Sequence, residues 1–408
     1  MLSAVTAMTE LVINVSNIVS SLCYSLIRLE PYNTCVHQCT YCYARWYRRN
    51  ESNNVIVPRV KAVYEFRTYA RKIYRIGLPP IPARLSTLVD PFIPHEELYR
   101  TSLTLLRIAL EYEYPVIVNT KSALILKSPW IDVLEKLAEK DLLLLQLSIS
   151  TLDNRVSRMI EPHAPAPELR LKVLQEFASR NIPVVVRLSP YIPRVSLYPS
   201  LKDFVEIVHE IGVKHVIVEA LRLESSSIKE FLQRFGLADV DVESYSLREV
   251  GGLRPLSRIS LSARLREYIA LQNALTKYGI TFATCKEGLF ALHTAKDCCG
   301  MYLFKRSLAL RPTLAEIYNI VRHCGPIPVD SVESVLRQLE TQGYLCGSRI
   351  TMYPKRIAKP FRYHEKKLLR VLRNPDILRH VAPSLNIVDG KIVAKDIAML
   401  EVGMENKS

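Results

Sequence analysis

The sequence predicts an α/β protein, built as a partial (β/α)6 barrel with a smaller C-terminal α+β module. Three observations predict this architecture. Between residues 25 and 232, short and nearly all-apolar runs alternate with amphipathic stretches. Strands that are apolar throughout are typical of a parallel sheet with both faces buried. Beyond residue 311 the pattern changes to two closely spaced helices followed by a short hairpin, which indicates a separate unit.

The expected strands follow one another along the chain. They are residues 25–31, 83–89, 115–120, 142–150, 183–190 and 214–221. Two of the stretches between them, residues 98–112 and 166–181, carry apolar side chains at helical spacing. Successive β–α units of this kind predict a TIM-like barrel, in which function lies at the C-terminal ends of the strands.

The chain is long enough for one large core and smaller units, with 408 residues of which 49% are hydrophobic. We divide it into five segments by composition and pattern. They are an N-terminal segment (1–24), the partial barrel (25–232), a cysteine-containing extension (233–310), a helical module (311–353) and a basic C-terminal tail (354–408).

The formal net charge of +15 favours a polyanionic partner such as nucleic acid, although a generic basic surface is the alternative. The N-terminal segment lacks the positive region of a signal peptide, and the apolar runs are too short to span a membrane. We therefore expect a cytoplasmic protein without a membrane partner. In that compartment the nine cysteines are expected to be metal ligands or free thiols.

The loop after the first expected strand reads "PYNTCVHQCTYCYAR" and holds Cys35, Cys39 and Cys42. Three thiolates at the spacing C-x3-C-x2-C can bind three irons of a 4Fe–4S cluster. Because no fourth cysteine is near, one iron is left open for a substrate or cofactor. A closed zinc site would need another ligand, such as His37, and this spacing is uncommon for zinc.

The motif resembles the signature of the radical SAM superfamily, in which an aromatic residue precedes the third cysteine. Tyr41 occupies that place. The resemblance implies that the open iron binds S-adenosylmethionine. It also implies that an electron from an external donor, such as ferredoxin or flavodoxin, drives cleavage of this cofactor to a 5′-deoxyadenosyl radical.

A narrower resemblance is to the radical SAM branch related to spore photoproduct lyase. It covers residues 31 to about 195 and is carried by "STLVDPF", "TKS", "SIST" and "EPHAPAPELRL" in addition to the cysteine loop. The resemblance implies that Tyr41, Lys121, Ser148 and Arg170 lie at the S-adenosylmethionine site. A solvated strand end is the alternative for Lys121, and a structural pair with Glu161 is the alternative for Arg170.

One departure from that branch concerns the hydrogen donor. The lyase uses a cysteine in the loop after the second strand, where this chain has Thr87 and its neighbours in "LSTLVDPF". Asp90 of the loop is present. The resemblance therefore does not extend to the repair chemistry, and we name Tyr43 as the candidate catalytic residue, with Tyr41 as the other candidate hydrogen donor.

A second cysteine group lies in "ATCKEGLFALHTAKDCCGMY", with Cys285, Cys298 and Cys299 close to His293. Its placement after the barrel resembles the auxiliary Fe–S clusters of many radical SAM enzymes. A zinc site, a donor thiol that reaches the barrel, and buried thiols or disulfides are the alternatives.

Residues 313–353 resemble a winged helix-turn-helix. A first helix ends near Cys324, a second covers about 330–342, and "YLCGSRITMY" is expected to be the hairpin wing. The second helix would then enter a nucleic-acid groove, and the basic tail would supply the electrostatic attraction. The alternative is a winged helix that packs against protein and a tail that is merely solvated.

The sequence thus predicts a radical SAM enzyme that acts on nucleic acid, in DNA repair or RNA modification. Two alternatives remain at this point. One is a radical SAM enzyme for a protein or small molecule, and the other is a DNA-binding iron–sulfur redox regulator.

Overall fold

The computed structural model describes residues 10–46, 55–245 and 255–400. The first nine residues of the expected N-terminal segment and the last eight of the expected tail lie outside this range. The main sheet is parallel and has seven strands in the order β1-β2-β3-β4-β5-β6-β10. They are Ile27–Leu29, Ala83–Leu85, Val116–Thr120, Leu143–Ile149, Val184–Tyr191, His215–Ala220 and Thr281–Thr284.

The predicted α/β fold is confirmed, and each of the six expected strands is present. The seventh strand, β10, pairs with β6 and comes from the segment expected to be an extension beyond the barrel. Its sequence, "TFAT", has no apolar run that marks it as a strand. Strands β1 and β10 form the two ends of the strand order, so the barrel is partial.

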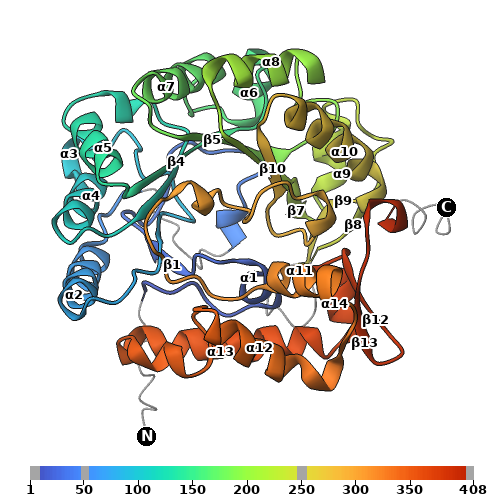
Figure 1. Cartoon of the computed structure of the whole chain (residues 1–408). Coiled ribbons are helices and arrows are strands. Elements are labelled where there is room, and N and C mark those ends of the chain that lie inside the picture. Colours follow the sequence, from blue (N-terminus) through green and yellow to red (C-terminus); the bar gives the residue numbers. More distant parts are fainter. Residues whose placement is uncertain (1–9, 47–54, 246–254, 401–408) are drawn as a thin grey trace, which may run out of the picture.

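Helices surround the sheet on its outer side, as Figure 1 shows. The long ones are α2 (Val60–Ile76), α4 (Thr101–Glu111), α5 (Trp130–Glu139), α7 (Pro167–Ser179), α8 (Leu201–Ile211) and α10 (Leu261–Lys277). Shorter ones lie at loop positions and are α3 (Glu96–Tyr99), α6 (Asn154–Ile160) and α9 (Ile228–Gln233). Among the described residues, no helix is both long and apolar enough to cross a membrane.

The inner face of the sheet has two chemically different layers. An apolar layer is made by one side chain from each of five neighbouring strands: Ile117, Leu144, Val185, Ile217 and Ala283. The chain segment after β10 packs against this layer with Met301 and Phe304, and Figure 1 shows it crossing the middle of the ring. The segment also contacts polar side chains of the strands, since Gln146 Nε2 donates to the Cys299 carbonyl at 2.7 Å and Arg84 donates to Cys299 Sγ at 3.2 Å.

A small antiparallel sheet extends the barrel near the end of β6. Its order is β7-β9-β8, with β7 at Arg222–Glu224, β9 at Leu256–Ile259 and β8 at Val242–Ser244. It carries Arg222 and packs beside Leu221 and Ile228, which belong to a separate apolar cluster near the cysteine loop.

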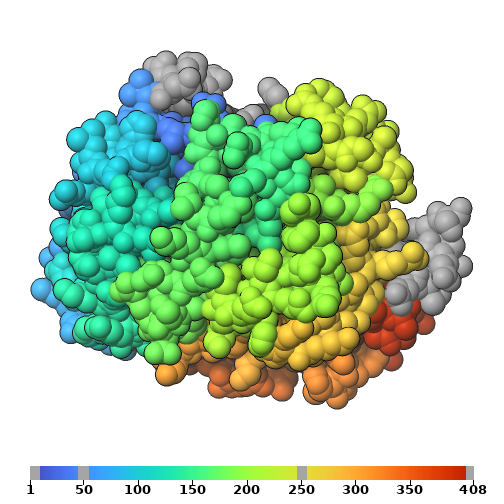
Figure 2. Space-filling model, turned by 90° about the horizontal axis from the view of Figure 1, so that it is seen from above, coloured from blue at the N-terminus to red at the C-terminus, as the bar shows by residue number. Residues whose placement is uncertain are grey.

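The C-terminal module packs along one side of the barrel, below it in Figure 1 and along one edge in Figure 2. Its elements are α11 (Leu314–Cys324), β11 (Ile327–Pro328), α12 (Val332–Thr341), α13 (Lys355–Leu372), α14 (Pro375–Val381), β12 (Leu385–Val388) and β13 (Lys391–Ala394). The strands form an antiparallel sheet in the order β11-β13-β12.

Helix α1 (Asn17–Leu22) joins this module to the N-terminal segment. Ser20 Oγ lies 2.8 Å from His364 Nδ1 on α13, and His364 Nε2 lies 2.8 Å from the carbonyl oxygen of Ile13. The buried imidazole therefore ties two segments that are far apart in the sequence.

Two predictions for the module are wrong. Residues 344–353 do not form a hairpin, because Gly347–Met352 is a 3-10 helix. The Glu340 carboxylate accepts the backbone N–H groups of Ser348 at 2.8 Å and Arg349 at 3.3 Å, which holds the chain in a helical turn. The hairpin of the module is β12–β13 instead.

The segment expected to be a basic tail is also folded. Helix α13 buries Ile357, Phe361, Leu368 and Leu372 at helical spacing and exposes its lysines and arginines on the opposite face. The many charged residues obscured an amphipathic pattern. The first half of the buried face packs in the barrel cluster, through Ile357 and Phe361, and the second half packs in the module core, through Leu368 and Leu372. The helices expected at 314–324 and in 330–342 are both present.

Candidate functional site

The loop of three cysteines lies at the C-terminal end of β1 and is fixed by backbone hydrogen bonds. The N–H of Thr40 donates to the carbonyl of Ile160 at 2.8 Å, and the N–H of Cys42 donates to that of Cys39 at 3.1 Å. Cys39 is buried, while Cys35 and Cys42 are half-buried. The loop is therefore anchored to the chain that follows β4, on the polar side of the barrel.

The thiols lie close enough to influence one another electrostatically. Burial raises the pKa of Cys35 to about 11, and nearby Asp90 and Cys42 contribute to this rise. Burial likewise raises the pKa of Cys39 to about 12, opposed by the positive charge of Lys121. Positively charged iron would stabilise the thiolate forms, so the chemistry of these donors fits an iron–sulfur cluster.

Among the described residues, no three His, Cys, Asp or Glu side chains converge as a single metal ion requires. A 4Fe–4S cube does not need such convergence, because each thiolate binds a different iron. The three thiols of the loop therefore fit such a cube by their chemistry.

His37 supports the loop and is not placed as a fourth metal ligand. Its Nδ1 lies 3.1 Å from the carbonyl oxygen of His163, and its Nε2 lies 3.5 Å from Asp90 Oδ2. Asp90 also accepts hydrogen bonds from the Thr120 hydroxyl and the Lys121 N–H, both at 2.7 Å. Burial raises the pKa of Asp90, but the hydrogen bond and charge of His37 outweigh it and lower the value to about 2.

A buried cluster around Glu161 brings together the side chains predicted to bind the cofactor. The Glu161 carboxylate accepts hydrogen bonds from Tyr41 and, at 2.8 Å, from Ser150, and it forms an ion pair with Arg170. Lys121 Nζ lies 3.9 Å from the same carboxylate. Glu161 therefore links three of the predicted cofactor residues.

Lys121 and Ser148 form the part of this cluster nearest the barrel interior. Lys121 Nζ donates to Ser148 Oγ at 3.1 Å and lies 5.9 Å from the centre of the Tyr41 ring. Arg170 is fully buried behind them, and its guanidinium donates to the Ser148 carbonyl at 3.1 Å and to the Pro165 carbonyl at 2.8 Å. Arg170 is thus placed to position Ser148 and Glu161, rather than to contact a ligand directly.

Tyr43 lies between the cysteine loop and the opposite wall of the barrel. Its hydroxyl donates to the carbonyl oxygen of Thr87, in the loop where the resembling branch has a cysteine. Lys286 Nζ and the Arg222 guanidinium lie over its ring, 5.5 and 5.6 Å from the centre. The candidate catalytic tyrosine, itself part of the cysteine loop, therefore contacts both the loop after β2 and a group of cations.

Several polar residues of this end of the barrel were missed from the sequence. The Glu30 carboxylate accepts hydrogen bonds from the hydroxyl groups of Ser86 and Thr87, each at an oxygen–oxygen distance of 2.6 Å. Glu219 and Arg187 lie on β6 and β5 and form an ion pair of 3.0 Å. A signal was present, since each of the last two interrupts an otherwise apolar strand sequence.

The second cysteine group lies inside the barrel. Cys285, Cys298 and Cys299 are buried, and the sulfur atoms of Cys298 and Cys299 are 3.8 Å apart. Arg84 donates to Cys299 Sγ at 3.2 Å, and Arg187 donates to Cys285 Sγ at 3.5 Å. The auxiliary Fe–S or zinc site stays a prediction, and the described residues show no mononuclear metal geometry there.

Cys299 is the chemically distinct thiol of this group. The hydrogen bond from Cys298 and the charges of Arg84 and Arg187, opposed by burial, lower its pKa to about 6. His293 is not part of the group, because its Nε2 accepts the Thr284 N–H at 3.1 Å. Its burial lowers the His293 pKa to about 3.

Residues 29–211, which carry the cysteine loop and the Glu161 cluster, match the family model described as the radical SAM superfamily. The chain carries a radical SAM domain. A radical SAM domain implies a 4Fe–4S cluster and S-adenosylmethionine as cofactors.

Two similar proteins are uncharacterized. The chain is 28% identical over 229 residues to protein ORF301 of Acidianus two-tailed virus, a match that covers 53% of this chain and 74% of the viral protein. It is 23% identical over 190 residues to protein MJ0683 of Methanocaldococcus jannaschii, which covers 45% of this chain and 64% of the archaeal protein.

Two solved structures are similar at low identity. A spore photoproduct lyase variant with bound AdoMet and dinucleoside spore photoproduct gives a TM-score of 0.44 at 13% identity, covering 62% of this chain and 73% of the lyase. SuiB of Streptococcus suis, bound to the precursor peptide SuiA, gives a TM-score of 0.40 at 16% identity, covering 65% and 50%.

Proposed function

We propose that this radical SAM enzyme holds a 4Fe–4S cluster on Cys35, Cys39 and Cys42, cleaves S-adenosylmethionine reductively, and modifies nucleic acid. The observation that carries the cofactor part is the position of the three-cysteine loop. It lies beside Lys121 at the polar end of the barrel, where the charge of Lys121 acts on Cys39. A reduced cluster supplies the electron that cleaves the sulfonium bond of S-adenosylmethionine.

The chain's own residues would bind and orient this cofactor. Lys121 offers an ammonium group to the cofactor carboxylate, and Ser148 offers a hydroxyl beside it. Glu161 and Arg170 hold these two groups in place from the buried side. The electron would come from an external donor such as ferredoxin or flavodoxin.

The surface charge of the C-terminal module supports a nucleic-acid substrate. Helix α13 exposes a row of basic side chains: Lys355, Arg356, Lys359, Arg362, Lys366 and Arg370. Exposed cations in a row attract phosphates and release counterions on binding.

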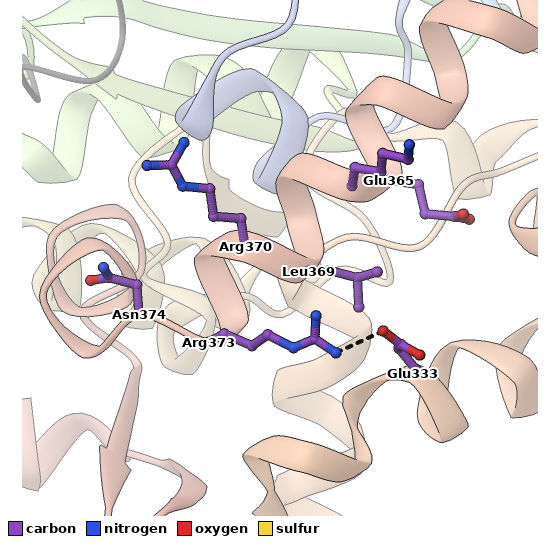
Figure 3. A pocket seen from close by; sticks show the side chains of 7 residues that line it. Glu333, Glu365, Leu369, Arg370, Arg373 and Asn374 are labelled. Atoms are coloured by element: carbon purple, nitrogen blue, oxygen red, sulfur yellow. Dashed lines mark hydrogen bonds and ion pairs between the residues drawn. The ribbon is translucent and has the colours of Figure 1, made fainter.

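Figure 3 shows the surface hollow at the end of this row, between α12 and α13. Arg373 reaches across it to Glu333 at 2.7 Å. Arg370 and Lys366 line the same hollow, together with Glu365. The acidic side chains reduce the charge at this end, so we place the strongest phosphate contacts toward Lys355 and Arg362.

The test is an anaerobic reaction of the reconstituted, dithionite-reduced enzyme with S-adenosylmethionine and single-stranded or duplex DNA or RNA. We expect 5′-deoxyadenosine in the presence of reductant, and a higher yield with one class of oligonucleotide. The stimulating oligonucleotide is then prepared in deuterated form. Transfer of its deuterium into 5′-deoxyadenosine would identify it as the substrate. Cleavage that no nucleic acid stimulates would favour a protein or small-molecule substrate, and the absence of cleavage would favour the redox regulator.

A further inference from the structure

We propose that Arg187, Arg222 and Lys286 form a binding site for a phosphate group of the nucleic-acid substrate at the polar end of the barrel. This inference rests on the proposed function and adds to it the part of the barrel that recognises the substrate. It concerns residues other than the predicted cofactor ligands.

The three cations come from different elements and converge on one carboxylate. Glu219, on β6, accepts from Arg187 at 3.0 Å and from Lys286 at 3.4 Å, and it forms an ion pair with Arg222. Arg187 lies on β5, Arg222 begins β7, and Lys286 follows β10. The fold therefore gathers three positive charges around a single negative one.

Two neighbouring carboxylates of the described residues, Glu161 and Glu30, are engaged with other groups. Glu161 already pairs with Arg170 and lies 3.9 Å from Lys121, and Glu30 accepts from neutral hydroxyl groups. The rings of Tyr43 and Tyr245 face Arg222 and offer only a weak electrostatic attraction. Since buried cations are costly unless they are paired, an anion from outside the chain would complete the charge balance.

Arg187 supplies the most specific sign of a missing partner. Arg187 is only 6% exposed, and its buried Nη1 has no hydrogen-bond partner among the described residues. Its Nη2, by contrast, donates to Glu219 at 3.0 Å and to Cys285 Sγ at 3.5 Å. A guanidinium whose second nitrogen is left open offers the donor geometry that phosphate oxygens prefer.

The site is reachable from solvent on one side. The side chain of Lys286 is 23% exposed and that of Arg222 is 12% exposed, whereas Arg187 lies deeper. A phosphate that enters from solvent would therefore contact Lys286 and Arg222 first and reach Arg187 from their side.

The position of this site separates it from the cofactor carboxylate. The charge of Lys121 opposes the burial-driven rise in the pKa of Cys39, and Lys121 lies beside the Tyr41 ring. Lys286 lies beside the ring of Tyr43, the residue that follows Cys42. S-adenosylmethionine carries one carboxylate, which the proposed function assigns to Lys121. A second anion site on the Tyr43 side would hold substrate close to the candidate catalytic tyrosine.

The experiment measures binding of a fluorescein-labelled tetranucleotide to the cluster-loaded enzyme by anisotropy, at several salt concentrations and with S-adenosylmethionine present. A probe this short limits contacts with distant basic surface. We expect Lys286→Gln to weaken binding about tenfold and to reduce the salt slope by about 0.7, the contribution of one phosphate contact on a single strand. Arg187→Met serves as a second, deeper variant with the same expected direction.

Arg180→Gln is the matched control. Arg180 is an exposed arginine that pairs with Glu135 and Glu176 on the outer helices. Its loss removes the same charge far from Glu219, so the tetranucleotide affinity should stay within twofold of wild type.

Tetranucleotide binding that is unchanged in Lys286→Gln and Arg187→Met would overturn the proposal. So would a loss confined to S-adenosylmethionine affinity, which would assign the cations to the cofactor. An acidic tetrapeptide that binds in a Lys286-dependent manner, where the tetranucleotide does not, would overturn the assignment to nucleic acid. Formation of 5′-deoxyadenosine by the wild-type enzyme without substrate is measured separately, so failure of the proposed function is recognised independently.

Discussion

At the scale of single residues, Glu161 shows how one buried carboxylate organises the candidate cofactor site. It contacts Tyr41, Ser150, Arg170 and Lys121, which come from the cysteine loop, the end of β4, helix α7 and the end of β3. Burial raises the pKa of Glu161, but Arg170 and Lys121 outweigh it, so the pKa is lowered and the carboxylate stays charged. The charge is needed because Arg170 is fully buried.

Replacement of this charge should destabilise the fold. Glu161→Gln leaves the Arg170 guanidinium without its counter-ion, and we expect a loss of about 3–5 kcal/mol in the free energy of unfolding. Urea denaturation followed by circular dichroism measures it. Glu176→Gln, which removes an exposed partner of Arg180, should cost no more than about 1 kcal/mol. Equal stabilities of the two variants would contradict the role given to Glu161.

Cys299 should be a thiolate at neutral pH. Its pKa in the folded protein is lowered from 9.0 to about 6. A lowered pKa means that the thiolate stabilises the fold fully above pH 9, and that this contribution is lost as the pH falls through 6. In cluster-free protein with ¹³C-labelled cysteine, one Cβ resonance should titrate near pH 6 and disappear in Cys299→Ser. A titration only above pH 8 would show that the thiol is not activated.

Site residues could be predicted where a sequence motif contains them. They could not be predicted where only tertiary contacts bring them together. The spacing of the three cysteines was visible in the sequence, and the structure places Tyr41, Lys121, Ser148 and Arg170 in one cluster. The convergence of Arg187, Arg222 and Lys286 was not visible. These residues are separated in the sequence and meet because β5, the start of β7 and the chain after β10 all lie beside Glu219.

At the scale of elements, helix α13 is the main difference between the expected and the observed molecule. Its seven lysines and arginines between 355 and 370 suggested a solvated tail, whereas the structure gives it a buried apolar face. Helices α11 and α12 were predicted because their apolar spacing is clear. The structure adds that Thr313 and Glu316 form a capping box at the start of α11. The predicted wing failed because a side-chain contact from Glu340, which no local pattern reveals, bends the chain.

The packing of α13 can be tested by truncating its buried face. Leu368→Ala should lower the free energy of unfolding by about 2–5 kcal/mol, because Leu368 is fully buried in the module core. Met352→Ala, at an exposed position just before the helix, should have an effect within about 0.5 kcal/mol. A solvated tail would make both variants as stable as wild type.

The exposed face of α13 gives a second test at this scale. Lys359→Glu combined with Arg362→Glu should weaken binding of a 20-nucleotide strand at least tenfold and flatten its dependence on salt. Both side chains are exposed, so the fold should be preserved. Binding that is insensitive to the double variant would remove α13 from the nucleic-acid surface.

At the scale of the whole molecule, one end of the barrel is filled by apolar packing and the other end carries the candidate functional residues. The segment after β10 packs apolar side chains into one end of the barrel. The other end holds the cysteine loop, the Glu161 cluster and the three cations that surround Glu219. The C-terminal module lies along the outside, joined to the N-terminal segment through His364. The alternation of strands and helices predicted the partial barrel and the cysteine loop at the C-terminal ends of its strands. It did not predict the seventh strand, whose short sequence lacks an apolar run, or the packing of the segment that follows it.

The central claim is that the loop of Cys35, Cys39 and Cys42 supports reductive cleavage of S-adenosylmethionine. The most direct measurement is the yield of 5′-deoxyadenosine, together with the iron content, for anaerobically reconstituted wild type, Cys39→Ala and Cys324→Ala. We predict about four cluster irons in wild type and in Cys324→Ala, whose thiol is exposed on α11. Cys39→Ala should lose the cluster and form at least a hundredfold less 5′-deoxyadenosine, and cleavage by Cys39→Ala at the wild-type rate would contradict the account.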